Sequence, residues 1–127
     1  MSVNKQMRIL VVDDFPTMRA IITKILRSLG FSKIMVAENG LHAWEMLERY
    51  EVDLIISDWS MPQMSGLELL QKVRNDPQYK DVPFLMVTAE AKQQNIIEAM
   101  QHKVSHYIVK PFTAETLWQK ICEIFKT

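Results

Sequence analysis

The feature that most constrains the fold of this chain is a set of four short apolar runs, each of which ends in polar residues. The residues at these ends are Asp13 and Asp14, Asp58, Thr88 and Lys110. Continuous runs of β-branched residues and leucine are typical of parallel strands that are buried on both faces. Open α/β sheets bind ligands at the carboxyl ends of their strands, so these polar residues are predicted to occupy a functional position.

Helical patterns separate the apolar runs. Apolar side chains recur at helical spacing after Pro16, which suits a first helical turn, and stop at Gly30, which suits a helix end. The predicted strands are 9–12, 33–37, 54–58, 84–88 and 107–110, and the predicted helices are 16–29, 41–52, 66–74, 90–101 and, with Thr113 as N-cap, 114–125. This alternation predicts a flavodoxin-like α/β fold with a doubly wound five-stranded parallel sheet. Its common strand order, 2-1-3-4-5, places the first and third strands side by side.

Length and composition are those of one domain, predicted to span residues 1–127 with residues 1–6 as a flexible arm. Fifteen basic residues balance fifteen acidic ones, so no nucleic-acid partner is expected. The single cysteine, Cys122, excludes an internal disulfide bond. No apolar stretch approaches the roughly 18 residues of a membrane span and no signal peptide is recognised, so we expect a cytoplasmic protein without a membrane partner.

The predicted strand order brings the carboxylates of Asp13, Asp14 and Asp58 together. When carboxylates lie this close, either the pKa of one of them is raised or the group binds a cation. A hard divalent ion suits their oxygen atoms, and Mg²⁺ fits best. Asp58 stands alone at its strand end, so one of its oxygens could attack phosphorus and form an aspartyl phosphate. Lys110 would place a positive charge beside the phosphoryl oxygens, and the Thr88 hydroxyl would donate a hydrogen bond to one of them.

Four motifs carry a resemblance to a known family: DDFPTMR (13–19), SDWSMPQMSGLELL (57–70), LMVTAEAK (85–92) and YIVKPFT (107–113). In this order they closely resemble the response-regulator receiver domains, and among these the stand-alone chemotaxis regulators. The resemblance covers essentially the whole chain. It implies a monomeric two-component response regulator that a histidine kinase phosphorylates on Asp58 and that then binds a flagellar motor switch protein. A phosphatase is a further expected partner.

The resemblance also implies a role for each residue of the site. The implied ligands of Mg²⁺ are the side chains of Asp13, Asp14 and Asp58 and the backbone carbonyl of Ser60. Thr88 and Lys110 would sense the phosphoryl group, and Ser60 and Glu90 would tune the rate of its hydrolysis. The chain would catalyse only its own phosphorylation and dephosphorylation, so it is not expected to be an enzyme toward other molecules.

Tyr107 is the rotamer switch that the resemblance implies. Phosphorylation would draw the Thr88 hydroxyl inward, and the Tyr107 ring would move into the vacated space. Lys92 and Lys120 are expected on the same switch and partner surface. Trp118 lies at the flank of the apolar arc of the last helix, and an exposed tryptophan there is predicted to border this surface and anchor a partner.

Two positions depart from the family pattern. Ser65 stands where many receivers carry aspartate, and we expect it to shape the loop rather than to bind metal. Lys103 stands in a segment where relatives often carry glycine. If Lys103 ends the fourth helix with a positive φ, its backbone carries strain that glycine would avoid.

Three other functions are open to this sequence. One is a stand-alone receiver in a different phosphorelay, and another is a receiver-like module that binds without modification, which the complete acidic set disfavours. The third is a phosphatase that forms an aspartyl phosphate. That class usually needs a second acid two residues after its nucleophile, and Ser60 occupies the place.

Overall fold

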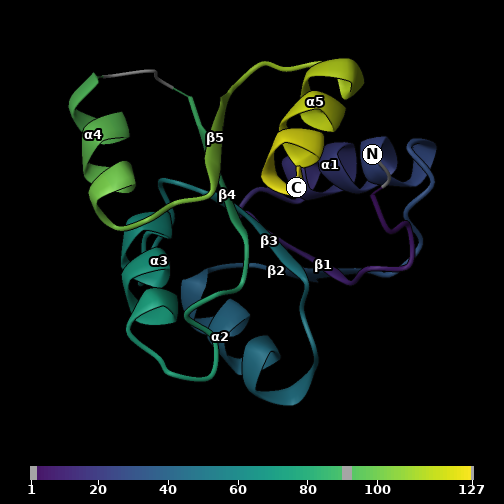
Figure 1. The fold of residues 1–127 in the computed structure, drawn as a ribbon. Helices are drawn as coiled ribbons and strands as arrows, with labels where there is room; N and C mark the ends of the chain where they lie inside the picture. The colour runs from purple at the N-terminus through teal and green to yellow at the C-terminus, as the bar shows by residue number, and fades with distance from the viewer. Residues whose placement is uncertain (1–2, 90–92, 127) are drawn as a thin grey trace.

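A computed structural model describes residues 3–89 and 93–126, and a five-stranded parallel sheet forms its centre (Figure 1). The strands are β1 (Ile9–Val12), β2 (Ile34–Ala37), β3 (Leu54–Asp58), β4 (Phe84–Thr88) and β5 (His106–Val109). They are arranged in the order β2-β1-β3-β4-β5, and each neighbouring pair is parallel. The predicted order is confirmed, and β1 lies beside β3.

In the described part of the chain, five helices cover both faces of the sheet (Figure 1). α1 (Pro16–Ser28) and α5 (Ala114–Ile124) lie on one face, and α2 (Gly40–Arg49), α3 (Gly66–Arg74) and α4 (Gln93–Gln101) lie on the other. The predicted flavodoxin-like fold is therefore confirmed. Residues 90–92, with which the fourth helix was predicted to begin, lie outside the described residues. No helix in the described ranges is long and apolar enough to cross a membrane.

Local sequence explains where most of these helices begin. Asn39, Ser65 and Thr113 precede α2, α3 and α5, and the side chain of each accepts a hydrogen bond from the amide three residues later. Glu68 completes a capping box with Ser65, so Ser65 shapes the start of α3 as expected. α1 differs, because its N-cap residue, Phe15, makes no side-chain cap.

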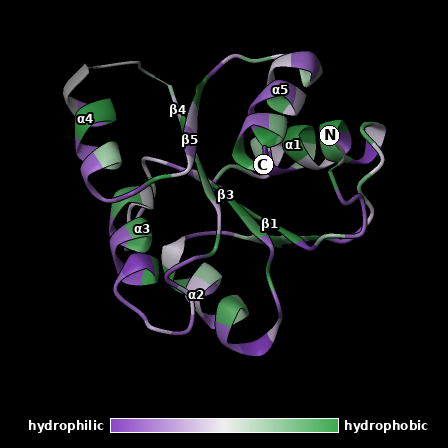
Figure 2. Cartoon of the chain, in the orientation of Figure 1, coloured by the Kyte–Doolittle hydropathy of each residue, from purple (hydrophilic) through white to green (hydrophobic). Residues whose placement is uncertain are grey.

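Alternate strand residues supply two separate apolar layers. Ile9 and Val11 of β1 belong to the layer that includes α1 and α5, whereas Leu10 and Val12 belong to the layer that includes α2 and α3. Figure 2 shows hydrophobic colouring along the central strands and hydrophilic colouring on the outer parts of the helices. Burial on both faces is the reason that the strands appear in the sequence as continuous apolar runs.

The N-terminal segment packs against the layer that includes α1 and α5. Val3 is 9% exposed and belongs to that layer. Lys5 Nζ donates to the carbonyl of Leu29. Val3 and Lys5 therefore contact the rest of the fold, and a flexible arm over residues 1–6 stays a prediction. Residues 1 and 2 lie outside the described part.

The turn after α4 contains a residue with a left-handed backbone. Lys103 has a φ of 63°, in the region that glycine adopts more easily than other residues. Its amide donates to the carbonyl of Met100 at 3.0 Å, which holds it against the end of the helix. The strain considered from the sequence is therefore present. Gln63, with a φ of 69°, shows the same conformation and no local sequence signal indicated it.

Candidate functional site

Three carboxylates converge at the carboxyl ends of β1 and β3. Val12 is paired with Ser57 in the register of these strands, so the residues that follow them emerge side by side. Asp13 is 0% and Asp58 6% exposed, and Asp14 is partly buried. Each of the three acids offers an oxygen, and these oxygens all lie within 4.8 Å of one another. The predicted acidic cluster is therefore formed.

Lys110 lies against this cluster. Its Nζ is 3.2 Å from Asp58 Oδ1 and 3.5 Å from Asp13 Oδ2. Its backbone is fixed as well, because the Lys110 amide donates to the carbonyl of Thr88 at 2.8 Å. The bond from Lys110 to Pro111 is cis. The ends of β4 and β5 thus bring one cation to three anions.

The environment of Asp58 disfavours its charged form. Burial raises the pKa of Asp58 first, and the negative charge of Asp13 raises it further. Lys110 and the Trp59 amide, which donates to Asp58 Oδ1 at 2.9 Å, act in the opposite direction. The net effect raises the pKa of Asp58. A further positive charge that enters the site would therefore stabilise the ionised carboxylate.

The backbone around Asp58 is held by a close contact with the start of α3. The Gly66 amide donates to the carbonyl of Trp59 at 2.8 Å. A Cβ built on Gly66 would lie 2.1 Å from the carbonyl oxygen of Asp58 and 2.9 Å from Met86 Sδ. No side chain fits in this space, so glycine allows α3 to begin directly against the strand end that carries Asp58.

One oxygen of the cluster lacks a partner. Asp14 Oδ1 is buried and accepts no hydrogen bond within the described part of the chain. Asp13 differs, since its Oδ1 accepts from the Phe15 amide at 2.9 Å and its carbonyl accepts from Arg19 Nη1 at 2.7 Å. Buried polar atoms normally have partners, and hard divalent cations prefer carboxylate oxygens. The donor set therefore fits such a cation.

A hollow of about 470 Å³ opens above these groups. It is lined by Asp14, Phe15, Asp58, Trp59, Ser60, Thr88, Ala89, Asn95 and Lys110. Thr88 is 7% exposed and reaches the hollow from the end of β4. The structure thus brings Ser60, Thr88 and Lys110 to the same place as the acids. Glu90 and Lys92, which were predicted to act here and on the switch surface, lie outside the described residues.

Two residues of the first motif were not recognised from the sequence as parts of the site. Phe15 and Arg19 lie inside the first motif, but only the two acids of that motif were assigned roles. Arg19 fixes the backbone of Asp13 from the first turns of α1. Its spacing of six residues from Asp13 was the available signal, since an arginine side chain can reach back over a helix start.

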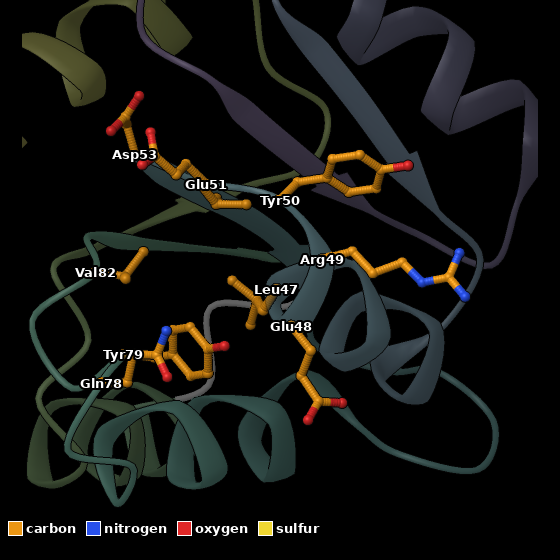
Figure 3. Close-up of a pocket in the computed structure, with 10 residues that line it drawn as sticks. Leu47, Glu48, Arg49, Tyr50, Glu51, Asp53, Gln78, Tyr79 and Val82 are labelled. Carbon is orange, nitrogen blue, oxygen red and sulfur yellow. The ribbon is translucent and has the colours of Figure 1, made fainter.

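A separate hollow lies near the starts of β3 and β4, and Figure 3 shows residues that line it. It measures about 410 Å³ and is formed by the segment from Leu47 to Asp53 together with Gln78, Tyr79 and Val82. None of the predicted site residues lines it.

The predicted switch residues divide between two flanks of α5. Lys120 Nζ lies 5.5 Å from the centre of the Tyr107 ring, so these two residues are brought together. Trp118 is partly buried on the other flank, with its ring centre 6.3 Å from that of Phe31 and Lys5 Nζ 4.0 Å above it. The premise that Trp118 is exposed beside the switch surface is therefore wrong, because the N-terminal segment and the turn after α1 already cover it.

Beside Tyr107, His106 joins β5 to α5. Its Nδ1 accepts from the Tyr107 amide at 2.9 Å, and its Nε2 lies 2.5 Å from Glu123 Oε2. The hydrogen bond from His106 lowers the pKa of Glu123. No local pattern in the sequence indicates this contact, because the partner lies 17 positions away.

Comparisons with known proteins agree with this geometry. The chain is 51% identical over 123 residues to the chemotaxis protein CheY-3 of Vibrio cholerae, covering 97% of this chain and 95% of that protein. It is 52% identical over 120 residues to the chemotaxis protein CheY of Pseudomonas aeruginosa, covering 94% and 97%.

A solved structure and a family pattern extend the comparison. The receiver domain of the sensor histidine kinase PA1611 from Pseudomonas aeruginosa, which has a magnesium ion coordinated in its active site cleft, matches with a TM-score of 0.86 and 27% identity, over 96% of this chain and 99% of that one. The pattern of the response regulator receiver domain matches residues 9–122. This chain therefore belongs to the response regulator receiver domain family and is a two-component response regulator.

Proposed function

We propose that this chain is a chemotaxis regulator whose Asp58 accepts a phosphoryl group from a histidine kinase, and whose phosphorylated form binds a flagellar motor switch protein. The observation that carries the proposal is the convergence of three carboxylates with Lys110, whose Nζ lies 3.2 Å from Asp58 Oδ1. The two chemotaxis proteins that are about half identical to this chain support the assignment to chemotaxis.

The acidic cluster is the proposed Mg²⁺ site. We assign its ligands to the side chains of Asp13, Asp14 and Asp58 and the backbone carbonyl of Ser60. The unpartnered Asp14 Oδ1 supports this assignment, as does the magnesium ion in the related receiver domain. When bound, the ion offsets the negative charge of the carboxylates and of the incoming phosphoryl group.

Asp58 is the proposed nucleophile. Lys110 Nζ and the Trp59 amide both contact Oδ1, which leaves Oδ2 to attack the phosphorus of a phosphohistidine. A P–O bond forms as the P–N bond breaks, and the imidazole nitrogen keeps the electron pair and takes a proton from water. Most of the catalysis comes from positioning and from charge already in place.

Lys110 and Thr88 hold the phosphoryl group after transfer. Lys110 Nζ can leave Asp13 and Asp58 for the new, more negative phosphoryl oxygens, because it is already within 3.5 Å of both carboxylates. The Thr88 hydroxyl lines the same hollow and donates to another oxygen. Their movement toward the phosphoryl group is the signal that leaves the site.

Tyr107 receives that signal. Tyr107 is half-buried on β5, and its partner in register is Met86 of β4. Thr88 lies on β4 as well, two residues after Met86. Withdrawal of the Thr88 side chain gives the Tyr107 ring room to turn inward, away from Lys120. The equilibrium between the two ring positions then sets how well the surface formed by α4, β5 and α5 binds the motor switch protein.

Hydrolysis ends the signal. Water attacks phosphorus and releases inorganic phosphate, which restores the Asp58 carboxylate. Ser60 lies at the hollow and influences the approach of this water, with Glu90 in the same proposed role. A separate phosphatase would shorten the phosphorylated state. Ser60 also argues against a phosphatase activity of the chain itself, because it lacks the carboxylate that would protonate a leaving group.

The proposal is tested with acetyl phosphate and Mg²⁺, with intact-protein mass spectrometry and Trp59 emission as readouts. We expect the wild-type chain to gain one phosphoryl group and to change its emission, and Asp58→Asn to do neither. Beryllofluoride with Mg²⁺ should change the emission in the same direction. Binding to a peptide from a motor switch protein should then strengthen only in the phosphorylated chain. Phosphorylation without stronger peptide binding would point to a different phosphorelay.

A further inference from the structure

His106 lies between the backbone of Tyr107 and the last helix. It belongs to β5, an edge strand of the sheet, and α5 lies beside this strand (Figure 1). Side chains alternate along a strand, so His106 points to the same face as Ile108, which belongs to the layer that includes α1 and α5. Tyr107 belongs to the layer on the opposite face. His106 can therefore reach α5 with its ring while it touches the Tyr107 backbone.

The two nitrogen atoms of the His106 ring have different partners. Nδ1 accepts a hydrogen bond from the Tyr107 amide at 2.9 Å, and Nε2 lies 2.5 Å from Glu123 Oε2. An accepting nitrogen carries no proton, so the neutral ring holds its proton on Nε2 and donates it to the Glu123 carboxylate. The His106 and Tyr107 rings are also in contact, with centres 5.8 Å apart and planes at 67°. His106 thus holds both the backbone and the ring of Tyr107.

A second proton on the His106 ring is incompatible with one of these contacts. It would be added to Nδ1, where it would face the N–H of Tyr107 at a distance that suits only a donor and an acceptor. The contact with Glu123 would survive, since an imidazolium still donates from Nε2 and is attracted by the carboxylate. The protonated ring therefore stays with α5 and releases Tyr107. Histidine side chains as a class change charge between about pH 5 and 8.

The groups that face His106 keep Glu123 ionised and in place. The hydrogen bond from His106 lowers the pKa of Glu123 most; desolvation opposes it, and the positive charge of Lys120 lowers it further. Gln119 donates to Glu123 Oε1 at 3.3 Å. On β4, the register partner of His106 is Leu85, which is apolar. A proton that enters this cluster near neutral pH is therefore bound by the His106 ring.

We propose that His106 is a positioning residue of the switch, which holds Tyr107 beside Lys120 when it is neutral and releases Tyr107 when it is protonated. This inference rests on the role proposed for Tyr107, and it adds a second input to the same equilibrium. Acidification favours the inward position of the Tyr107 ring even without a phosphoryl group. Phosphorylation then has a smaller free-energy difference to overcome.

The first test follows Tyr107 by NMR in the unphosphorylated chain without divalent cations. As the pH is lowered from about 8 to about 5, the Tyr107 amide proton should move upfield, because it loses its acceptor. This change should have the same midpoint as the titration of the His106 ring protons. The nuclear Overhauser effects between the Tyr107 ring and the Lys120 methylene groups should weaken over the same range.

Two variants control this measurement. His106→Asn provides a side-chain oxygen that can accept the same amide bond but does not titrate, so both changes at Tyr107 should be lost. Asp58 is intact in this variant, so any effect of its own titration would remain visible. His42→Asn should retain both changes. It is a matched control because His42 Nδ1 also accepts from a backbone amide, that of Glu38 at 3.2 Å, on a different helix.

The second test measures binding of a labelled peptide from a motor switch protein by fluorescence anisotropy. The ratio of the affinities at pH 6 and pH 8 is determined for the unphosphorylated wild type and for His106→Asn. Dividing the first ratio by the second cancels any pH response of the peptide itself. The result should be about fivefold, which is the effect of one hydrogen bond on an equilibrium.

The outcomes separate this inference from the proposed function. A Tyr107 amide that does not follow the His106 titration overturns the inference, and so does an unchanged contact between Tyr107 and Lys120. Equal affinity ratios in the wild type and His106→Asn also overturn it. If beryllofluoride and Mg²⁺ never strengthen peptide binding, the proposed motor-switch function fails, and the NMR measurements still decide the role of His106. His106→Gln is a second variant that does not titrate, and the unfolding midpoint shows whether each variant is folded.

Discussion

The two ends of β3 carry one aspartate each, and the two residues stand in opposite environments. Asp53, just before the strand, is exposed and accepts a hydrogen bond from the Arg8 amide at 2.7 Å. Asp58, at the other end, is 6% exposed, faces Asp13 and has a pKa that burial raises. Asp53 keeps its charge in contact with water, whereas Asp58 is buried where its charge opposes folding. Such an arrangement indicates chemistry rather than structural support.

The largest expected difference between the two aspartates is in phosphorylation. Asp58→Asn should abolish incorporation of a phosphoryl group from acetyl phosphate, because the amide is not a nucleophile under these conditions. Asp53→Asn, at the other end of the same strand, should retain the wild-type rate. Intact-protein mass spectrometry over a time course measures both. Comparable labelling of Asp58→Asn would remove the distinction between the two ends.

The second prediction concerns stability at the amino end, where one side chain is not freely exposed. Arg74 donates to the carbonyls of Val82 at 2.6 Å and Lys103 at 2.9 Å, so it joins the segments that lead into β4 and β5. Arg74→Met keeps the stem and removes these bonds, which should lower the free energy of unfolding by about 2 kcal/mol. Lys80→Met, an exposed neighbour, should change it by less than about 0.5 kcal/mol. Urea denaturation monitored by circular dichroism tests the pair.

The third prediction uses the pKa of Asp58. Its direction is upward from the usual 3.8, so the ionised carboxylate opposes folding at neutral pH. In the absence of divalent cations, Asp58→Asn should therefore have a higher unfolding midpoint than the wild type at pH 7. Below the unfolded-state pKa, Asp58 is protonated in both states, and the difference should disappear. A stabilisation that stayed constant from pH 7 to pH 3 would assign the effect to packing instead.

The smallest effect is expected from the exposed ion pair at the amino end. Arg8 Nη1 lies 2.8 Å from Glu51 Oε2, and the Glu51 side chain is 86% exposed. Glu51→Gln should change the free energy of unfolding by less than about 0.5 kcal/mol, and salt should reduce even that. Denaturation at two ionic strengths measures it. If Glu51→Gln lowered the free energy of unfolding as much as Arg74→Met, the ion pair between Arg8 and Glu51 would contribute more to stability than its exposure indicates.

Most of the fold could be predicted because its strands are buried on both faces. The runs that become β1, β3 and β4 lie 0–7% exposed along their length, so their sequence has little freedom. The bounds of α3 were predicted correctly, since Ser65 caps its start and Asn75 ends it. The burial of Val3 was not predicted, because a single valine in a polar segment carries no periodic pattern, and only the folded chain shows that it joins the apolar layer that includes α1 and α5.

The acidic cluster and Lys110 could be predicted for a related reason. Their place follows from strand order alone, which brings the ends of β1, β3, β4 and β5 together. Trp118 and Phe15 depend on finer detail. Helical periodicity put Trp118 on a flank of α5 but could not reveal that Phe31 and Lys5 cover it. The exposure of Phe15 depends on the path of the backbone between Asp13 and Pro16, for which the sequence carries no pattern.

The contact between Gly66 and the backbone of Asp58 bears on how this protein can vary. A methyl group at position 66 would meet a carbonyl oxygen at 2.1 Å, and moving α3 away to admit it would displace the strand end that carries the reactive carboxylate. Saturation mutagenesis of residues 60–66 should thus find tolerated substitutions at Gln63, which is exposed, with Gly, Asn and Asp favoured by its left-handed backbone, and none at Gly66. We therefore expect variation in this loop on its solvent-facing side, while the position that contacts the strand end stays glycine.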